Sequence, residues 1–425
     1  MRTNYTPSYI MSISTVVVGA GIGGLYVAYQ LLKTHDGSVI VLEKGEEVGG
    51  RVFTYKDASM RVEAGAGRFS KDHTLFIKLL KEFDLYSLVV QNGVMSGHYH
   101  IGASGDVCFI PQAQVDPVKR KLISFRKKRS KSYLQSVSLV SFARSVLSAD
   151  EVQFLLDSFG YYSELVLMNA YDCIRLMGEL DSRHYSLRGG LSLVIRELQT
   201  RIRRLGGKIF VKKEVREIHD TECGFSLRCR DGTAYSCENL VCALSKDALD
   251  HLPFFKRVAS LTRGIVGAPL CRIYVKYPVQ RGYGPWFKGL KKFTVNNELR
   301  MVIPISEEKG VIMISYSDNR FADFWKRIEN RYGETGINRV IQKKIKEVLG
   351  IDIPDAKAIR TFYWSSGVGY WTPGADSDAV SRQIIRPFPE KNVFVCGENF
   401  SAKYQQWMEG ALETGSRVVE LIRRG

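Results

Sequence analysis

The chain has 425 residues, of which 45% are apolar and 25% charged, an ordinary composition for a globular protein. Because this length exceeds what one hydrophobic core usually organises, we expect two domains. Lys and Arg number 61 against 44 Asp and Glu, giving a formal net charge of +17. This excess favours an anionic partner, cofactor or substrate without choosing among nucleic acid, anionic lipid and small molecules.

The composition also excludes several classes of protein. The eight cysteines form no CxxC pair and have no matching histidine cluster, so we expect no metal site and no disulfide scaffold. Residues 1–14 lack the apolar core of a secretory signal, and the apolar run at 15–20 is far shorter than the about 20 residues that span a bilayer. We therefore expect a soluble, cytoplasmic protein with reduced thiols and no transmembrane segment.

A strand, a glycine-rich turn and a helix follow one another at residues 15–32. Gly19, Gly21 and Gly24 form a GxGxxG motif, and a second strand at 38–42 ends at Glu43. In such a βαβ unit, glycines let the backbone approach a pyrophosphate, the helix N-terminus receives its charge, and the acid accepts from ribose hydroxyls. The pattern predicts dinucleotide binding and leaves NAD and FAD open.

Residues 43–51 continue with Lys44, a glycine pair ending at Gly50, and Arg51. This extension would bring more backbone and a cation to the phosphates. With it, the chain resembles the flavin-containing amine oxidoreductase family, which includes monoamine oxidases, polyamine oxidases and L-amino-acid oxidases.

Three later segments are similar to motifs of the same family. Residues 187–191, followed by a helix, look like the segment in which the family's chain returns to its FAD domain. Val215 stands where the family usually places a valine whose backbone contacts the adenine. Residues 239–245 look like the strand that leaves that domain. Residues 392–399 and 407–416 are similar to the closing strand and helix, whose N-terminus would point at the flavin.

The resemblance implies FAD as the cofactor. In monoamine oxidases a cysteine links FAD covalently, and the corresponding position here is Gly369, so we expect noncovalent binding. The cofactor-binding residues that the motifs predict are Gly19, Gly21, Gly24, Glu43, Lys44, Gly50, Arg51, Gly65, Ala66, Gly67, Arg68, Val215, Gly397, Glu398, Trp407 and Met408.

The implied fold is α/β: a Rossmann-like FAD-binding domain interleaved with a mixed-sheet and helical substrate-binding domain. Residues 11–73, 186–252 and 375–425 would form the first, and 74–185 with 253–374 the second. The resemblance leaves open whether the protein forms a homodimer.

Arg68 is the strongest pointer to the substrate. Its Gly-x-x-Arg setting at 65–68 is similar to that of L-amino-acid oxidases, including tryptophan oxidases, in which the arginine pairs with the substrate α-carboxylate. A guanidinium suits this task because two parallel N–H groups match two carboxylate oxygens. The alternatives are a surface arginine and one paired with Glu63.

Lys292 lies eight residues before Arg300, which opens an apolar strand. Family members use such a lysine to hold a water near flavin N5. An ordinary basic turn, with Lys291 turned inward instead, is the alternative reading.

Trp407 and Tyr370 are candidates for the two rings that the family stands against the flavin, with Trp364 or Trp371 as alternatives to Tyr370. We take Trp371 as a candidate substrate-binding residue. A tryptophan in this cage favours an amino-acid substrate, with a large apolar or aromatic side chain. Core packing is the more common use of such rings.

Residues 119–131 hold eight cations in thirteen positions. A solvated helix or loop is the usual meaning of such a run, and contact with nucleic acid or an anionic membrane is the sharper alternative.

These observations predict an FAD-dependent enzyme that converts an L-amino acid and O2 to the 2-oxo acid, ammonia and hydrogen peroxide. A monoamine or polyamine oxidase is the nearest alternative, and a desaturase-like relative of protoporphyrinogen oxidase another. An alternative from a different class is a flavin-binding structural or interaction protein that contacts an anionic partner through residues 119–131.

Overall fold

The computed structural model describes residues 13–35, 37–180 and 183–424. The expectation that no secretory signal precedes the first strand concerns residues 1–14, and most of these lie outside the described residues.

The first large sheet contains the predicted βαβ unit: β1 (Ile13–Val18), α1 (Ile22–Lys33) and β2 (Val39–Leu42). Its strand order over the described residues is β10-β2-β1-β13-β12-β11, with β19 beside β13. The strands β10, β2, β1, β13 and β19 pair with one another in parallel. The strand β12 pairs antiparallel with both β13 and β11. The later strands are β10 (Lys208–Phe210), β11 (Val215–Thr221), β12 (Gly224–Cys229), β13 (Ala234–Cys242) and β19 (Val393–Val395).

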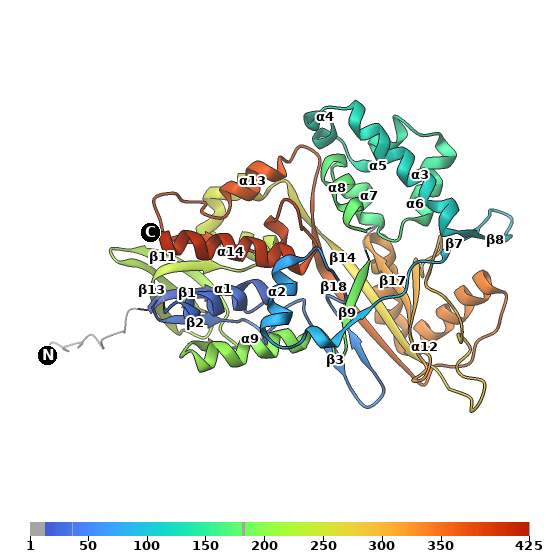
Figure 1. The fold of residues 1–425 in the computed structure, drawn as a ribbon, viewed down its shortest axis with the longest axis horizontal. Coiled ribbons are helices and arrows are strands. Elements are labelled where there is room, and N and C mark those ends of the chain that lie inside the picture. The colour runs from blue at the N-terminus through green and yellow to red at the C-terminus, as the bar shows by residue number, and fades with distance from the viewer. Residues whose placement is uncertain (1–12, 36, 181–182, 425) are drawn as a thin grey trace.

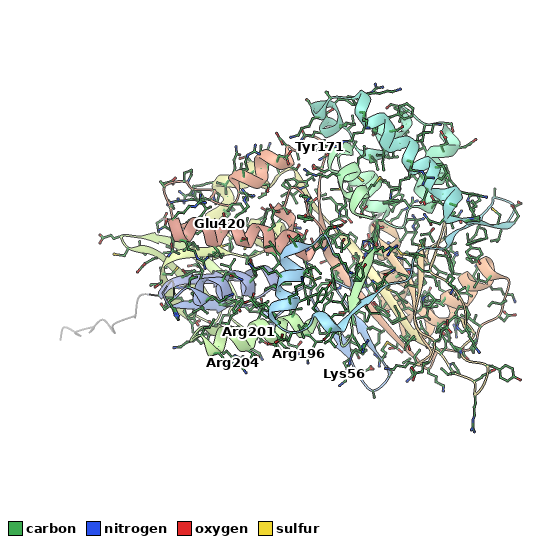
Figure 2. All side chains as sticks on the ribbon, in the orientation of Figure 1. Lys56, Tyr171, Arg196, Arg201, Arg204 and Glu420 are labelled. Carbon is green, nitrogen blue, oxygen red and sulfur yellow. The ribbon has the colours of Figure 1, made fainter. Side chains whose placement is uncertain are left out.

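Three helices pack together beside this sheet. α1 lies between α14 (Met408–Arg424) and α9 (Ser192–Arg204) (Figure 1). The helices α1 and α14 approach closely, because a Cβ on Gly23 would lie 3.3 Å from the Ala411 carbonyl oxygen. The outer side of α9 carries Arg196, Arg201 and Arg204 (Figure 2), while its buried residues are all apolar (Val194, Ile195, Leu198 and Ile202), as expected of an amphipathic helix.

The second large sheet has the order β18-β14-β17-β16-β15-β7-β8 in the described residues. Its longest strands are β14 (Ile265–Lys276) and β18 (Ala358–Trp371), which pair antiparallel. The long helix α12 (Asn319–Leu349) packs on it and buries Trp325 in a core shared with β14 and β17. The remaining strands are β7 (Gly97–Ile101), β8 (Val107–Pro111), β15 (Phe293–Val295), β16 (Met301–Ser306) and β17 (Val311–Asp318).

A cluster of helices lies beside the second sheet, at the upper right of Figure 1. It comprises α3 (Gln112–Phe125), α4 (Lys131–Ser136), α5 (Leu139–Arg144), α6 (Ala149–Ser158), α7 (Tyr162–Leu167) and α8 (Ala170–Leu180). The basic segment 119–131 runs along α3, the short helix η2 (Arg126–Lys128) and the start of α4. Part of its charge is balanced within the chain, since Lys121 pairs with Glu151 and Lys131 with Asp378, both at 2.7 Å.

Short elements connect these parts. β5 (Phe69–Ser70), β9 (His184–Leu187) and β6 (Val89–Gln91) form a small sheet, and β3 (Thr54–Lys56) pairs with β4 (Arg61–Glu63). The other helices are α2 (Thr74–Glu82), η1 (Tyr86–Leu88), α10 (Lys246–Asp250), η3 (Pro253–Val258), α11 (Ala259–Thr262), α13 (Ser377–Gln383) and η4 (Glu398–Phe400).

The predicted mixed α/β fold is confirmed. The strands of the first large sheet come from the three segments assigned to the FAD-binding domain, and those of the second come from the other two. We keep this discontinuous division as a proposal; the small β5-β9-β6 sheet joins the two sets. In the described residues, no helix combines the length and hydrophobicity needed to cross a membrane.

Candidate active site

A cavity of about 730 Å³ runs from the carboxyl ends of the first sheet's parallel strands to the second sheet. Residues from β1, from β2 and from the segment after β13 line one end, and residues from β14, β17, β18 and α7 line the other. The carboxyl edge of a parallel sheet is where α/β folds bind ligands.

The turn between β1 and α1 is shaped by glycine. Gly19 has φ +102°, and a Cβ on Gly24 would lie 2.0 Å from the Gly19 carbonyl oxygen, so the turn leaves no room for side chains at these positions. A Cβ on Gly21, by contrast, would meet no heavy atom within 4 Å. Gly21 is also the N-cap of α1 and provides no side-chain cap, and the first turn of the helix carries no acid. Open space at an uncapped helix N-terminus fits a phosphate.

Glu43 directly follows β2 beside this turn. Its carboxylate accepts from the backbone N–H of Ala20 at 2.9 Å and of Gly45 at 2.8 Å. These bonds fix the carboxylate and leave lone pairs on both oxygens, as acceptance from a ribose requires.

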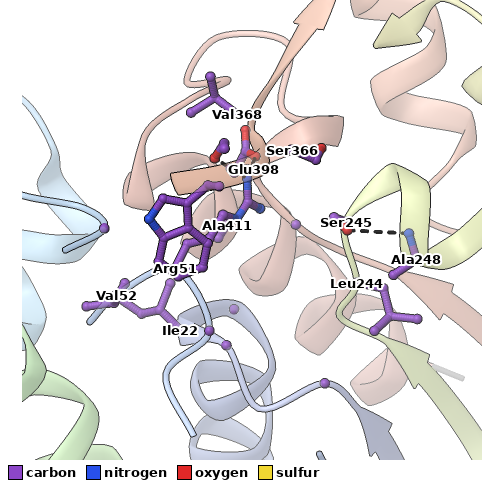
Figure 3. Close-up of a pocket in the computed structure, with 18 of the residues that line it drawn as sticks. Ile22, Arg51, Val52, Leu244, Ser245, Ala248, Ser366, Val368, Glu398 and Ala411 are labelled. Atoms are coloured by element: carbon purple, nitrogen blue, oxygen red, sulfur yellow. Dashed lines mark hydrogen bonds and ion pairs between the residues drawn. The ribbon is translucent and has the colours of Figure 1, made fainter. Parts of the chain in front are cut away.

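Arg51 lines the cavity. It donates to the Gly367 carbonyl at 3.0 Å and pairs with Glu398 at 2.5 Å (Figure 3). Glu398 also accepts from the Gln406 backbone N–H at 2.8 Å, so the pair connects the turn after β2 to the segment before α14.

Arg68 lies between two aromatic rings. Its guanidinium carbon is 5.4 Å from the ring centres of both Tyr161 and Trp407, and it donates to the Tyr161 hydroxyl. Glu63, the alternative partner, is used elsewhere: it accepts from Thr54 Oγ1 and the Leu191 N–H, and burial raises its pKa to about 7. Among the described residues no carboxylate forms an ion pair with Arg68.

Trp407 is held by two histidines. His184 stacks on its ring at 5.5 Å and 10°, and His73 meets it edge-on at 4.9 Å. Burial lowers the pKa of His184 to about 3 and that of His73 to about 4, so both rings are neutral at pH 7.

Lys292 lies behind this group and does not line the cavity. Burial, and then the charge of Arg68, lowers its pKa to about 7, and its charge in turn contributes to the lowered pKa of His184. Lys291 is exposed, so Lys292 is the lysine that turns inward.

The predicted residues divide into two groups. Gly24 and Trp371 join Lys292 outside the lining: Gly24 packs against the turn, and buried Trp371 donates its indole N–H to the Ser401 carbonyl at 3.1 Å. The structure thus places Trp371 in the core, on the opposite side of β18 from Tyr370, as alternation along a strand requires. The predicted residues that line the cavity are Gly19, Gly21, Glu43, Lys44, Gly50, Arg51, Gly65, Ala66, Gly67, Arg68, Val215, Tyr370, Gly397, Glu398, Trp407 and Met408.

The polar residues of the wall that sequence reasoning missed include Tyr161, Glu164, Arg272 and Tyr316. Arg272 was detectable as a charge within the apolar run of β14. It donates to the Glu63 carbonyl at 3.0 Å and to the Tyr316 hydroxyl at 3.2 Å. The other three carry no motif, and only the fold brings them to the cavity.

The cavity fits FAD. The open space at Gly21 can receive the pyrophosphate, Glu43 the ribose, and the region between Arg51 and Met408 the flavin ring. A Cβ on Gly369 would lie 2.2 Å from Asn399 Nδ2, so a cysteine could not occupy this position without a shift.

Comparisons with known proteins agree with this geometry. A model of the family described as flavin containing amine oxidoreductase matches residues 22–423. Polyamine oxidase 1 of Zea mays is 21% identical over 96% of this chain and 89% of its own length. L-amino-acid oxidase of Crotalus adamanteus is 41% identical over 70 residues, which are 16% of this chain and 13% of that protein. The solved structure of a putrescine oxidase variant has a TM-score of 0.79 at 14% identity and covers 97% of this chain and 99% of its own.

Proposed function

Because the chain belongs to the flavin-containing amine oxidoreductase family, we propose that it catalyses the FAD-dependent oxidation of an L-α-amino acid. Overall, the amino acid, water and O2 would give the 2-oxo acid, ammonium and hydrogen peroxide. Bound FAD supplies the acceptor for the two electrons of the C–H bond next to the amine.

The observation that carries this proposal is the position of Arg68. A guanidinium in the cavity wall, held between two rings and without a carboxylate partner among the described residues, is prepared to bind an anion. Arg272 is a weaker candidate, because Nη1 and Nη2 already donate to Glu63 and Tyr316.

The chain's other groups fit this assignment. Tyr161 and Trp407 hold the guanidinium in place, and the buried rings of Trp407 and Tyr370 exclude water from the reacting end of the cavity. Lys292 does not itself line the cavity, so its proposed part is to hold a water that reaches its Nζ and to exchange a proton with it; burial and the charge of Arg68 lower its pKa to about 7.

An amine or polyamine oxidase is the second candidate. Its support is the full-length similarity to the maize polyamine oxidase and the fold shared with putrescine oxidase. An amine substrate has no carboxylate, so it would leave Arg68 without an anionic partner.

The test is to mix the flavin-loaded protein anaerobically with separate pools of L-amino acids, monoamines and polyamines and to record the flavin absorbance. We expect the amino-acid pool to reduce the flavin fastest. In Arg68→Ala, flavin content should stay normal while kcat/KM for the active amino acid falls by at least about 100-fold, since a charge-assisted pair is lost. Unchanged kcat/KM in that variant would remove the assignment of Arg68.

A further inference from the structure

Glu164 is a buried carboxylate in the cavity wall with an unsatisfied oxygen. It lies on α7, only 2% of its surface is exposed, and it lines the cavity. Its Oε2 has no hydrogen-bond partner. Burying a carboxyl group without a partner is costly, so one that points into a ligand cavity indicates that a ligand completes it.

The groups around Glu164 differ in charge. Among the charged groups that act on it, Asp318 is the acid, and Arg68 and then Lys119 are the cations, whereas Tyr161, Tyr370 and Cys173 are neutral neighbours because burial raises the pKa of each. The neighbouring Asp318 is satisfied, since it accepts from the backbone N–H groups of Tyr162 at 3.1 Å and Ser163 at 2.8 Å. Glu164 receives no such bond at Oε2, so this one oxygen of the wall lacks a donor among the described residues although the whole chain is strongly basic.

The protonation of Glu164 fits this interpretation. Burial, and then the charge of Asp318, raises its pKa to about 8. At pH 7, before a ligand binds, Glu164 therefore holds a proton. A cation bound beside it would favour the ionised form, so binding should release a proton below about pH 8 and require no release above it.

Glu164 and Arg68 belong to one site. Arg68 donates to the hydroxyl of Tyr161, which precedes Glu164 by three residues at the start of α7. Arg68, which can bind an anion, and Glu164, whose Oε2 has no partner, therefore line the same part of the cavity. A ligand with a carboxylate at one end and a cation at the other would satisfy both.

We infer that Glu164 binds a second, cationic nitrogen at the far end of the substrate, so that the preferred substrates are L-amino acids with a basic side chain, such as L-lysine. This inference rests on the proposed function for the carboxylate at Arg68. It replaces the large apolar or aromatic side chain that the sequence favours, because an apolar side chain would cover the carboxyl group of Glu164 and leave it without any partner.

Four compounds separate the two receptors. L-Lysine has the carboxylate and the distal amine, L-norleucine has only the carboxylate, cadaverine only the distal amine, and pentylamine neither. The rate of anaerobic flavin reduction by each is measured in the wild type, in Glu164→Gln, in Arg68→Ala, and in Glu420→Gln. The last is the same substitution at an exposed position on α14 (Figure 2) that does not line the cavity.

We expect the wild type and Glu420→Gln to prefer L-lysine over L-norleucine by about 10- to 100-fold, and Glu164→Gln to lose most of this preference. An L-norleucine rate equal to or above that of L-lysine, or a preference that survives in Glu164→Gln, overturns the inference. If L-norleucine in that case still reduces the flavin much faster than pentylamine does, the proposed function stands and only the inference about Glu164 fails. If instead cadaverine equals L-lysine and Arg68→Ala changes neither, the cation receptor stands and the proposed function fails.

A second measurement does not depend on turnover. 6-Aminohexanoate and hexanoate are L-lysine and L-norleucine without the α-amine, so neither can undergo the proposed oxidation. Calorimetry at pH 7 should show 6-aminohexanoate binding at least about tenfold more tightly, with release of a proton, and Glu164→Gln should remove both effects. Equal binding of the two acids to the wild type would contradict the inference even if no compound reduced the flavin.

Discussion

Arg68 obtains its role from neighbours that are distant in sequence. Tyr161 lies at the start of α7 and Trp407 just before α14, and both rings meet the same guanidinium. The local motif at 65–68 was enough to predict an arginine that lines the cavity, and the ending around Trp407 was enough to predict a ring there; their part in substrate binding stays a proposal. Glu164 could not be predicted, because burial without a donor is a property of the folded wall and leaves no pattern in the sequence.

Lys292 should make the stability of the protein depend on pH. Its pKa is lowered from the ordinary value of 10.5 to about 7. Between those values the unfolded chain holds a proton that the folded chain does not, so lowering the pH through this window favours unfolding. We expect Lys292→Met to be more stable than the wild type at pH 7, on the order of 2 kcal/mol, and the difference to shrink toward pH 10.

Denaturant unfolding of both proteins at pH 7, 8, 9 and 10 measures this difference. Lys291→Met, at the exposed neighbour, is the control and should track the wild type at every pH. A difference between Lys292→Met and the wild type that grows with pH would show that the lysine is paired, not merely buried.

At the scale of elements, the β1–α1–β2 unit was predictable because its glycines and Glu43 act locally. The structure begins α1 at Ile22 and ends β1 at Val18, close to the expected bounds. The wall formed by β14, β17 and α7 was not predictable, since strand order and helix placement depend on contacts among distant segments.

Gly21 separates cofactor binding from folding within this unit. It has φ −69° and ψ 176°, which any residue adopts, and a Cβ there meets no protein atom within 4 Å. Gly21→Ala should therefore leave the melting temperature of the FAD-free protein unchanged. A methyl group in the phosphate space should weaken FAD binding at least about tenfold, equivalent to about 1.4 kcal/mol.

Fluorescence titration of the FAD-free protein with FAD gives the dissociation constant, and calorimetric scans give the melting temperature. Gly93→Ala is the matched control, because its Cβ also meets no atom within 4 Å and Gly93 does not line the cavity. If Gly21→Ala bound FAD as tightly as Gly93→Ala, the pyrophosphate would not lie at this turn.

At the scale of the molecule, the cavity is lined by both large sheets and by segments from residue 18 to residue 411. The discontinuous division that the family motifs predict agrees with the origin of the strands in each sheet. The closeness of the two parts around the cavity follows from the small β5-β9-β6 sheet and from the hydrogen bond that Arg51 donates to the Gly367 carbonyl on β18, neither of which a motif predicts.

FAD should therefore stabilise the whole chain and not only the first sheet. At a free concentration 100 times the dissociation constant, a ligand that binds only the folded state adds about 2.7 kcal/mol. We expect FAD to raise the melting temperature of the FAD-free protein by a few degrees in one cooperative transition. Two transitions, of which FAD shifts only one, would show that the proposed domains unfold independently.

Recognition of the substrate carboxylate by Arg68 is the central claim, and L-norleucine and pentylamine test it most directly because they differ only in that group. The measurement is the ratio of their rates of anaerobic flavin reduction in the wild type and in Arg68→Ala. We predict that L-norleucine is at least about 100-fold faster in the wild type and that the variant loses most of this preference. Equal rates in the wild type, or a preference that persists in Arg68→Ala, would contradict the account.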